Sequence, residues 1–174
     1  MAAIRRTRPD DVEPLAALKL ATFRETFVEG FGIPYPPDDL AVFVAESYAA
    51  DRVAAELADP ERATWVAEDA AGRLLGYAQV GPCKLPHDDI GSGDGELYQL
   101  YTLREAQGLG LGRTLLNVAL DHLAAKRPGR VWLGVWSGNL FAQRIYERCG
   151  FARVGGYGFP VGSWTDEEFI YRRG

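Results

Sequence analysis

Cysteine is scarce in this chain, where only Cys83 and Cys149 occur among 174 residues. The two lie far apart and without the spacing of metal ligands, so the sequence indicates neither a disulfide framework nor a zinc site, and no metal is expected. Because nothing in the cysteine pattern requires an oxidising environment, the expected compartment is the reducing cytoplasm.

Long apolar runs are also lacking. No stretch reaches the roughly 18 apolar residues of a membrane-spanning helix. The N-terminus, MAAIRRTRPDD, has arginines but no apolar segment behind them, which differs from the pattern of a signal peptide. We therefore expect no membrane partner and no cleaved leader.

Positive charge is in deficit, with 19 lysines and arginines against 24 acidic residues and a net charge of −5. This balance argues against nucleic acid or an anionic membrane surface as the main partner, and small cationic or neutral substrates fit better. The deficit is largest between Arg24 and Glu61, where nine acidic residues face two basic ones. That segment is either a set of solvated helix faces or an attractor for cationic substrates.

Apolar residues, by contrast, make up 47% of the chain, enough for a full hydrophobic core, and we expect a single domain over residues 1–174. Loops 28–37 and 81–95 are rich in glycine and proline and are candidates for the rim of a substrate site. The apolar periodicity predicts strands at 4–7, 63–68, 74–80, 96–103, 130–136, 151–154 and 168–172. Four helices are expected: one capped by Asp10 and ended by the glycines and prolines of 28–37, one capped by Asp38 or Asp39 and reaching Tyr48, one over 110–126 and one over 139–149.

Glycine is concentrated in one segment, EAQGLGLGRTLL at 105–116, which follows a predicted strand and opens a helix. The first N–H groups of a helix lack partners and attract anions, so this arrangement predicts a phosphate site. A Walker loop requires Gly-Lys-Ser/Thr, whereas Gly112 is followed by Arg113-Thr114. The dinucleotide fingerprint also fails, because Arg113 stands at the position of its third glycine.

The pattern that fits is Gln107-x-x-Gly110-x-Gly112. It resembles the Q/R-x-x-G-x-G/A signature of the GCN5-related N-acetyltransferases, in which backbone amides hold the pyrophosphate of acetyl-CoA. A second segment, NLFAQRIYERCGF at 139–151, is similar to another signature of that family. There Asn139 caps a helix, and a tyrosine follows two turns later on the same helix face.

The resemblance covers nearly the whole chain and is most specific over 97–151. It implies an α/β fold of the α+β type, with a mixed, mostly antiparallel sheet of about seven strands, splayed between the fourth and fifth, and about four helices. It further implies acetyl-CoA as cofactor. The residues matched to its site are Tyr101, Thr102, Leu103, Gln107, Gly108, Leu109, Gly110, Leu111, Gly112, Arg113, Thr114, Asn139 and Tyr146.

Within the family, the segments LYQLYTL, VWLGVWSGN and ATFRETF look closest to bacterial polyamine (spermidine-type) N-acetyltransferases. Such relatives often carry an acidic residue or histidine after the tryptophan of the fifth strand, where this chain has Ser137. The implied reaction is direct attack of a small-molecule primary amine on the thioester in a ternary complex. The sequence leaves open a protein or peptide N-terminus as acceptor, and also a non-catalytic module that only binds acetyl-CoA.

Two residues are expected to move protons in that reaction. The resemblance assigns Tyr146 as the acid toward the departing thiolate, and Glu96, at the start of a strand, as the base acting directly or through water. His87 or water remain alternatives for the base. His122 is expected to be structural, and Cys149 a small buried residue. Whether the chain acts alone or as a homodimer is left open.

Overall fold

The computed structural model describes the whole chain, residues 1–174, and contains one seven-stranded mixed sheet. The strand order is β1-β2-β3-β4-β5-β7-β6, and only the β4–β5 pair is parallel. This is the expected fold class. The strands are β1 Ala3–Arg6, β2 Ala63–Glu68, β3 Leu74–Pro82, β4 Gly95–Thr102, β5 Val131–Trp136, β6 Ala152–Val161 and β7 Trp164–Arg173.

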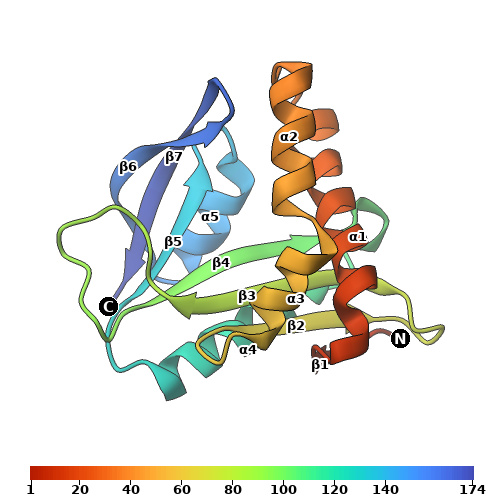
Figure 1. Cartoon of the computed structure of the whole chain (residues 1–174). Coiled ribbons are helices and arrows are strands. Elements are labelled where there is room, and N and C mark those ends of the chain that lie inside the picture. Colours follow the sequence, from red (N-terminus) through yellow and green to blue (C-terminus); the bar gives the residue numbers. More distant parts are fainter.

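Five α-helices cover the sheet, one more than expected. Helix α4 lies beneath β2–β4, α5 lies beside β5, and α1 to α3 cover the opposite side of the sheet (Figure 1). The unpredicted helix is α3, although its sequence does carry a helical pattern, since Val53 and Leu57 lie one turn apart and both pack against the main core. The helices are α1 Val12–Phe23, α2 Pro37–Ser47, α3 Ala50–Ala58, α4 Leu111–Lys126 and α5 Leu140–Arg148.

The predicted caps of the first two helices are wrong. Helix α1 begins at Val12, after a 3₁₀ turn, and Asp11 rather than Asp10 occupies the cap position. Helix α2 begins at Pro37, whose fixed φ suits a first helical position. The Asp39 carboxylate accepts instead from the backbone N–H of Ser163, at 2.9 Å. The Asp39 carboxylate, which the local pattern assigns to helix capping, is therefore bound to a residue distant in sequence.

The sheet is splayed between β4 and β5, as expected. The two strands pair only where Gly95–Leu97 lies beside Val131–Leu133. Beyond that, β4 continues along β3 as far as Thr102 while β5 continues along β7 as far as Trp136, and Figure 1 shows the two diverging. The facing edges of both strands therefore have no strand partner along their outer halves.

A β-bulge changes which side chains of β4 share a face. Gln79 of β3 lies opposite Gln99, whereas the next residue, Val80, lies opposite Leu97, so Tyr98 is an extra residue in β4. A bulge interrupts strict alternation and bends the strand. As a result Tyr98 and Gln99, although adjacent, both face the same cavity, which is described below.

The segment after α1 bridges the two arms of the splay. Helix α1 continues past Phe23 as a π-helical segment, Arg24–Gly30, in which the Phe31 N–H donates to the Thr26 carbonyl. The Phe27 ring contacts Tyr101 of β4, and the Phe31 ring lies 4.6 Å from that of Trp136 in β5, centroid to centroid.

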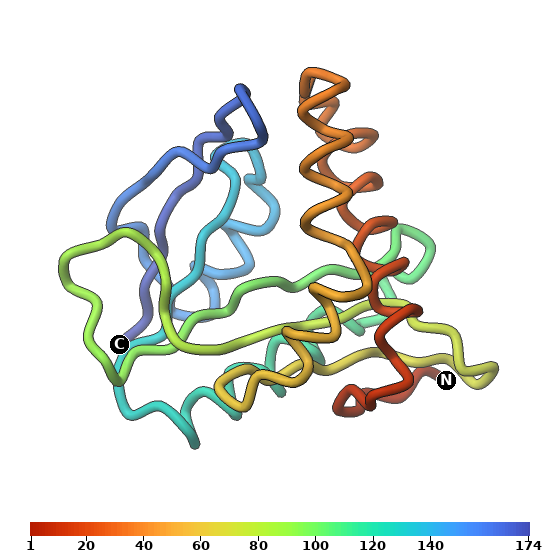
Figure 2. The backbone as a smooth tube through the Cα atoms, in the orientation of Figure 1, coloured from red at the N-terminus to blue at the C-terminus, as the bar shows by residue number.

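Strands β6 and β7 are much longer than the predicted 151–154 and 168–172. The segment GGYGFP reads as a turn because of its glycines and proline, yet pairing with β7 holds it extended up to Val161. The resulting hairpin stands opposite α2 in the tube drawing (Figure 2), and the ring of Phe43 in α2 contacts that of Phe159. These two elements enclose the space over the splay.

Candidate active site

The segment that joins β4 to α4 presents a row of free backbone donors. No N–H group from Gly108 to Arg113 donates a hydrogen bond to another group of the chain, and the first such donor after Gln107 is Thr114. No side chain caps the helix. Free N–H groups at a helix N-terminus, aligned with the helix dipole, favour an anion.

Glycine occurs at the three positions of this segment for different physical reasons. Gly108 and Gly110 have φ values of +82° and +79°, which L side chains rarely adopt. Gly112 has no such restriction, and an added Cβ would meet nothing closer than Thr102, at 3.9 Å. Nothing inside the chain requires glycine at 112, so its smallness leaves free surface on the helix.

The side chains around these glycines point in two directions. Leu103 and Leu111 are buried in the main core, so only their backbone groups face outward. Leu109 is 67% exposed, and the Gln107 and Arg113 side chains are exposed. An unpaired guanidinium beside six free N–H groups makes this surface locally positive on a chain with a net charge of −5.

Helix α5 carries Asn139 at its start and Tyr146 two turns further on, the two residues of the second signature. The Asn139 side chain accepts from the Ala142 N–H at 3.1 Å, so it caps the helix as expected. Tyr146 is half-buried against Phe151, and its hydroxyl makes no hydrogen bond within the chain. Burial raises the Tyr146 pKa to about 12.

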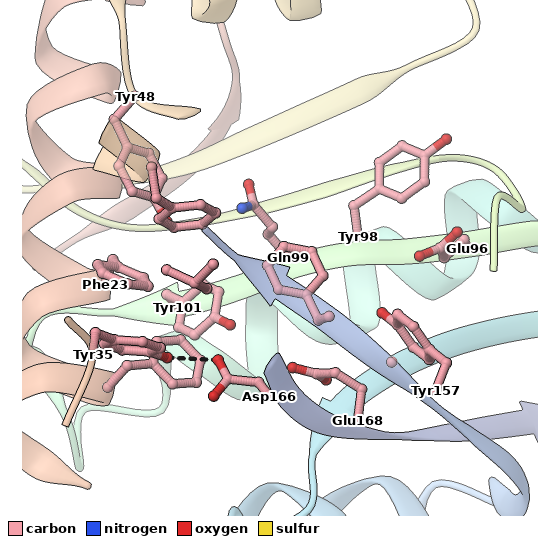
Figure 3. A pocket seen from close by; sticks show the side chains of 15 residues that line it. Phe23, Tyr35, Tyr48, Glu96, Tyr98, Gln99, Tyr101, Tyr157, Asp166 and Glu168 are labelled. Atoms are coloured by element: carbon pink, nitrogen blue, oxygen red, sulfur yellow. Dashed lines mark hydrogen bonds between the residues drawn. The ribbon is translucent and has the colours of Figure 1, made fainter. Parts of the chain in front are cut away.

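A cavity of about 160 Å³ lies over the splay, between the π-helical segment, α2 and the β6–β7 hairpin (Figure 3). Aromatic rings and carboxylates dominate its walls, and no lysine, arginine or histidine lines it. The lining residues are Phe23, Phe27, Tyr35, Phe43, Tyr48, Glu96, Tyr98, Gln99, Tyr101, Gly134, Tyr157, Phe159, Val161, Asp166 and Glu168.

The three carboxylates of the cavity differ in their partners. Asp166 accepts from the Tyr35 hydroxyl at 2.6 Å and from the Trp164 indole at 2.9 Å. Glu96 is buried; its Oε2 accepts from the Lys84 N–H at 2.8 Å, and the Cys83 thiol is a second, weaker donor to this carboxylate. Glu168 makes no hydrogen bond within the chain, so two carboxylates retain free acceptors.

The two less satisfied carboxylates also have raised pKa values. Burial raises the pKa of Glu96 to about 7, although the hydrogen bond from the Lys84 N–H lowers it in part. Burial, and then the charge of Asp166, raises the pKa of Glu168 to about 8. A carboxylate with a pKa near the working pH is suited to general-base catalysis.

Tyrosines connect these carboxylates to α5. The pKa of Tyr157 is raised by burial and then by Glu168 and Glu96, and Figure 3 shows Tyr157 between the two. Burial likewise holds the pKa of Tyr101 well above its usual range, with Glu168 and Tyr146 adding to it. Tyr146 does not line the cavity itself.

The histidines lie away from this cavity. The His87 ring packs 5.0 Å from Trp132, and its Nδ1 accepts from the Asp89 N–H, so the free base that the sequence leaves open is already engaged. His122 packs against Trp65, which agrees with a structural role.

The two cysteines are free thiols and are half-buried. Burial raises the pKa of Cys83 to about 12, which keeps its thiol protonated. Cys149 follows the last residue of α5 and packs against the main core, as expected for a small buried residue.

The acidic segment 24–61 does not supply the charge of the cavity. None of its nine acidic residues lines the cavity walls. Glu56 is paired with Lys19, and Glu61 with Arg127. These groups stabilise contacts between elements, so the attraction for cationic substrates expected of this segment is not supported; the cavity charge comes from β4 and β7.

Asp166 and Glu168 are the residues that sequence reasoning missed. A usable signal exists, because the two stand at alternate positions of a strand that also buries Ile170. Two carboxylates on the buried face of a strand are unusual and indicate a site. Of the predicted site residues, the structure brings Glu96 and Tyr101 into the cavity and places the glycine segment and Asn139 at the outer ends of β4 and β5, while Tyr146 lies two turns along α5 from Asn139.

A sheet opened between two parallel strands, with free helix N–H groups at the end of one of them, is suited to a cofactor that carries phosphates and an extended arm. The chain belongs to the acetyltransferase (GNAT) family, whose model matches residues 20–151. Members of this family take their acetyl group from acetyl-CoA, and the chain is an acetyl-CoA-dependent N-acetyltransferase.

Relatives of similar length support this assignment. The chain is 32% identical over 163 residues to an uncharacterized N-acetyltransferase of Mycobacterium tuberculosis, covering 94% of this chain and 97% of the relative. It is 30% identical over 164 residues to the streptothricin acetyltransferase of Streptomyces lavendulae, covering 87% and 82%. Its fold is similar to that of the PaiA N-acetyltransferase of Thermoplasma acidophilum, solved in complex with coenzyme A, with a TM-score of 0.76, 21% identity and coverage of 99% and 98%.

None of the helices has both the length and the apolar character needed to cross a bilayer.

Proposed function

We propose that this enzyme transfers the acetyl group of acetyl-CoA directly to a primary amine of a small molecule, with polyamines as the leading candidates. The observation that carries the proposal is the cavity over the splay, whose walls combine three carboxylates with nine aromatic rings and no basic side chain. Such walls attract ammonium groups through charge and through the faces of the rings.

The residues present fit acetyl-CoA. Free N–H groups from Gly108 to Arg113 suit its phosphates, and the open surface at Gly112 permits close approach. The unpaired edges of β4 and β5, near Thr102 and Leu103, suit an extended arm carrying amide groups, as in strand addition. When bound, the cofactor supplies an acetyl thioester.

Residues matched to the family signatures take the remaining cofactor roles. Gln107, Leu109 and Thr114 surround the phosphate site on the outer surface of the segment. Tyr101 stands where the cofactor arm would meet the cavity, and Leu111 contributes its backbone N–H. Asn139 retains a free side-chain N–H₂ group after capping α5.

We assign the two proton transfers to residues on different elements, Glu96 on β4 and Tyr146 on α5. Glu96 has a pKa of about 7, so near neutral pH a large fraction is ready to accept a proton from the amine, directly or through water. Tyr146 has a free hydroxyl and a pKa of about 12, so it retains the proton that the leaving thiolate requires.

Two further comparisons favour a small acceptor. The relative from Streptomyces lavendulae is named as an acetyltransferase of streptothricin and not of a protein. The cavity volume of about 160 Å³ is suited to one end of a slender molecule.

The test is to mix enzyme and acetyl-CoA with separate acceptors: alkyl monoamines, diamines, polyamines, arylamines and peptides with free N-termini. Free thiol reports turnover and product mass locates the acetyl group. Aliphatic amines with a second cationic group should give the highest kcat/KM. Preference for peptides or arylamines would contradict the acceptor class, and thiol release without an acetylated amine would contradict N-acetyl transfer to these acceptors.

A further inference from the structure

Gln99 is the most unusual polar residue of the cavity. Its Oε1 is the only buried side-chain nitrogen or oxygen of the chain without a hydrogen-bond partner. Leaving a buried acceptor unpaired costs about 1–3 kcal/mol, so most proteins satisfy or remove such a group. The chain keeps this one at the wall of the cavity.

The position of Gln99 follows from the bulge in β4. In a regular strand it would face away from Tyr98, but the extra residue turns both toward the cavity. Its partner across the strands, Gln79, is satisfied by Thr64, Glu56 and Arg62. The amide nitrogen of Gln99, like its oxygen, makes no hydrogen bond in the chain.

The polar groups around Gln99 include free donors as well as acceptors. The Glu168 carboxyl and the hydroxyls of Tyr48, Tyr101 and Tyr157 make no hydrogen bond in the chain, whereas both oxygens of Asp166 accept, from Tyr35 and Trp164. None of these groups donates to Gln99 Oε1, so a donor on a bound ligand can pair with it. The last torsion of a glutamine is soft and roughly two-fold, so Gln99 can turn its carbonyl oxygen toward such a ligand.

We propose that Gln99 determines acceptor specificity by accepting a hydrogen bond from a second donor group of the substrate, a hydroxyl or a second ammonium separate from the amine that is acetylated. The inference rests on the proposed function, since it concerns the acceptor site of that reaction. Gln99 acts in recognition and takes no part in proton transfer.

The test compares n-alkylamines with amino alcohols of the same chain length, which differ by one uncharged donor. In the wild type, kcat/KM for the best amino alcohol should exceed that for its matched alkylamine by about tenfold, the effect of one well-placed hydrogen bond. In Gln99→Leu this ratio should fall to about one, while KM for acetyl-CoA stays unchanged. The Tm of Gln99→Leu should stay level or rise, because an unpaired buried group is removed.

Tyr98→Phe is the matched control. Tyr98 lies beside Gln99 in the bulge and also lines the cavity, but its hydroxyl donates to the Pro82 carbonyl and is committed to the fold. This variant should lower Tm and keep the wild-type ratio between amino alcohol and alkylamine. A ratio that falls equally in both variants would show a general disturbance of β4 and overturn the proposal for Gln99.

Equilibrium binding of the same amines to the enzyme with coenzyme A, followed by tryptophan fluorescence, separates the two proposals. If amines are acetylated but the ratio is the same in wild type and Gln99→Leu, the specificity role is overturned and the proposed function stands. If no amine is acetylated but binding shows the preference and its loss in Gln99→Leu, the proposed function is overturned and the recognition role stands. Absence of both binding and turnover overturns both.

Discussion

Tyr146 combines a half-buried ring with a hydroxyl that makes no hydrogen bond inside the chain. Replacing it by phenylalanine keeps the packing against Phe151 and removes only the hydroxyl. General acid catalysis contributes typically 10²–10⁴-fold, so Tyr146→Phe should lower kcat by at least about tenfold even when water substitutes as donor. Affinity for acetyl-CoA should change little. Steady-state kinetics under conditions in which chemistry limits turnover make this measurement.

The melting temperature provides the control for Tyr146→Phe. Since the hydroxyl has no partner in the chain, Tm should match that of the wild type, and a lower kcat then reports chemistry and not unfolding. An unchanged kcat would show that Tyr146 only packs against its neighbours.

Glu96 is tested by its pH dependence. Because its pKa is about 7, the wild-type kcat/KM should rise through a limb near pH 7 as the carboxylate ionises. Glu96→Gln keeps an oxygen to accept from the Lys84 N–H but cannot take a proton. The variant should lose that limb and at least about 10²-fold in kcat at pH 8. A limb that survives in Glu96→Gln would assign it to another group, with Glu168 next in line.

Stability gives an independent check on the same residue. A carboxyl whose folded pKa is raised from 4.5 to about 7 holds its proton in the folded state after the unfolded chain has released it. Its ionisation therefore makes the free energy of unfolding fall as pH rises from about 4.5 to beyond 7. The free energy of unfolding of Glu96→Gln, minus that of the wild type, should therefore be larger at about pH 8 than at about pH 5. Denaturant unfolding of both proteins at the two pH values measures this difference.

At the scale of elements, glycine serves two purposes at the N-terminus of α4: Gly112 leaves room for the cofactor, and Gly110 permits a positive φ. Gly112→Ala should raise the free energy of unfolding by up to about 1 kcal/mol without ligand, because alanine favours the helix and finds open space. It should also weaken acetyl-CoA binding, and Gly112→Asp should do so more strongly by adding charge. Gly110→Ala should destabilise the chain, since its φ is +79°. Denaturant unfolding and calorimetric binding measure both effects.

If folded Gly112→Asp binds acetyl-CoA as tightly as the wild type does, the phosphates of the cofactor do not bind at the N-terminus of α4.

Elements whose signals are local could be predicted from the sequence. Asn139 caps α5 because its side chain reaches an N–H three residues away, and Gly108 and Gly110 adopt the positive φ that glycine permits. The prediction that Asp39 caps α2 is wrong because its carboxylate accepts from Ser163, which lies 124 residues away in sequence.

The acceptor side of the site was less predictable because it depends on long-range register. Glu168 reaches the cavity only through antiparallel pairing, in which it lies opposite Trp136 of β5 and Tyr157 of β6. Gln99 faces the cavity only because of the bulge at Tyr98, which no local pattern marks. Glu96 is expected from the family resemblance, which implies a carboxylate near the start of this strand, and the structure places it at the cavity wall.

At the scale of the whole molecule, net charge and cavity charge have the same sign. The chain carries −5, and the acceptor cavity is lined by three carboxylates. Attraction over a distance is screened by salt, with a Debye length of about 8 Å at 0.15 M. The KM for a polyamine should therefore rise with sodium chloride concentration, and more steeply than the KM for an alkyl monoamine. Equal salt dependence for both amines would argue against a charge-selective acceptor site.

The central claim is that the splay joins a phosphate site on α4 to an acidic acceptor cavity, so that donor and amine meet between β4 and β5. The most direct test is a crystal structure of the dead-end complex with coenzyme A and the best amine of the panel. The account predicts phosphates on the N–H groups of Gly108 to Arg113, the thiol near Tyr146 and the amine nitrogen facing Glu96. Coenzyme A bound away from α4, or an amine outside the cavity, would contradict it.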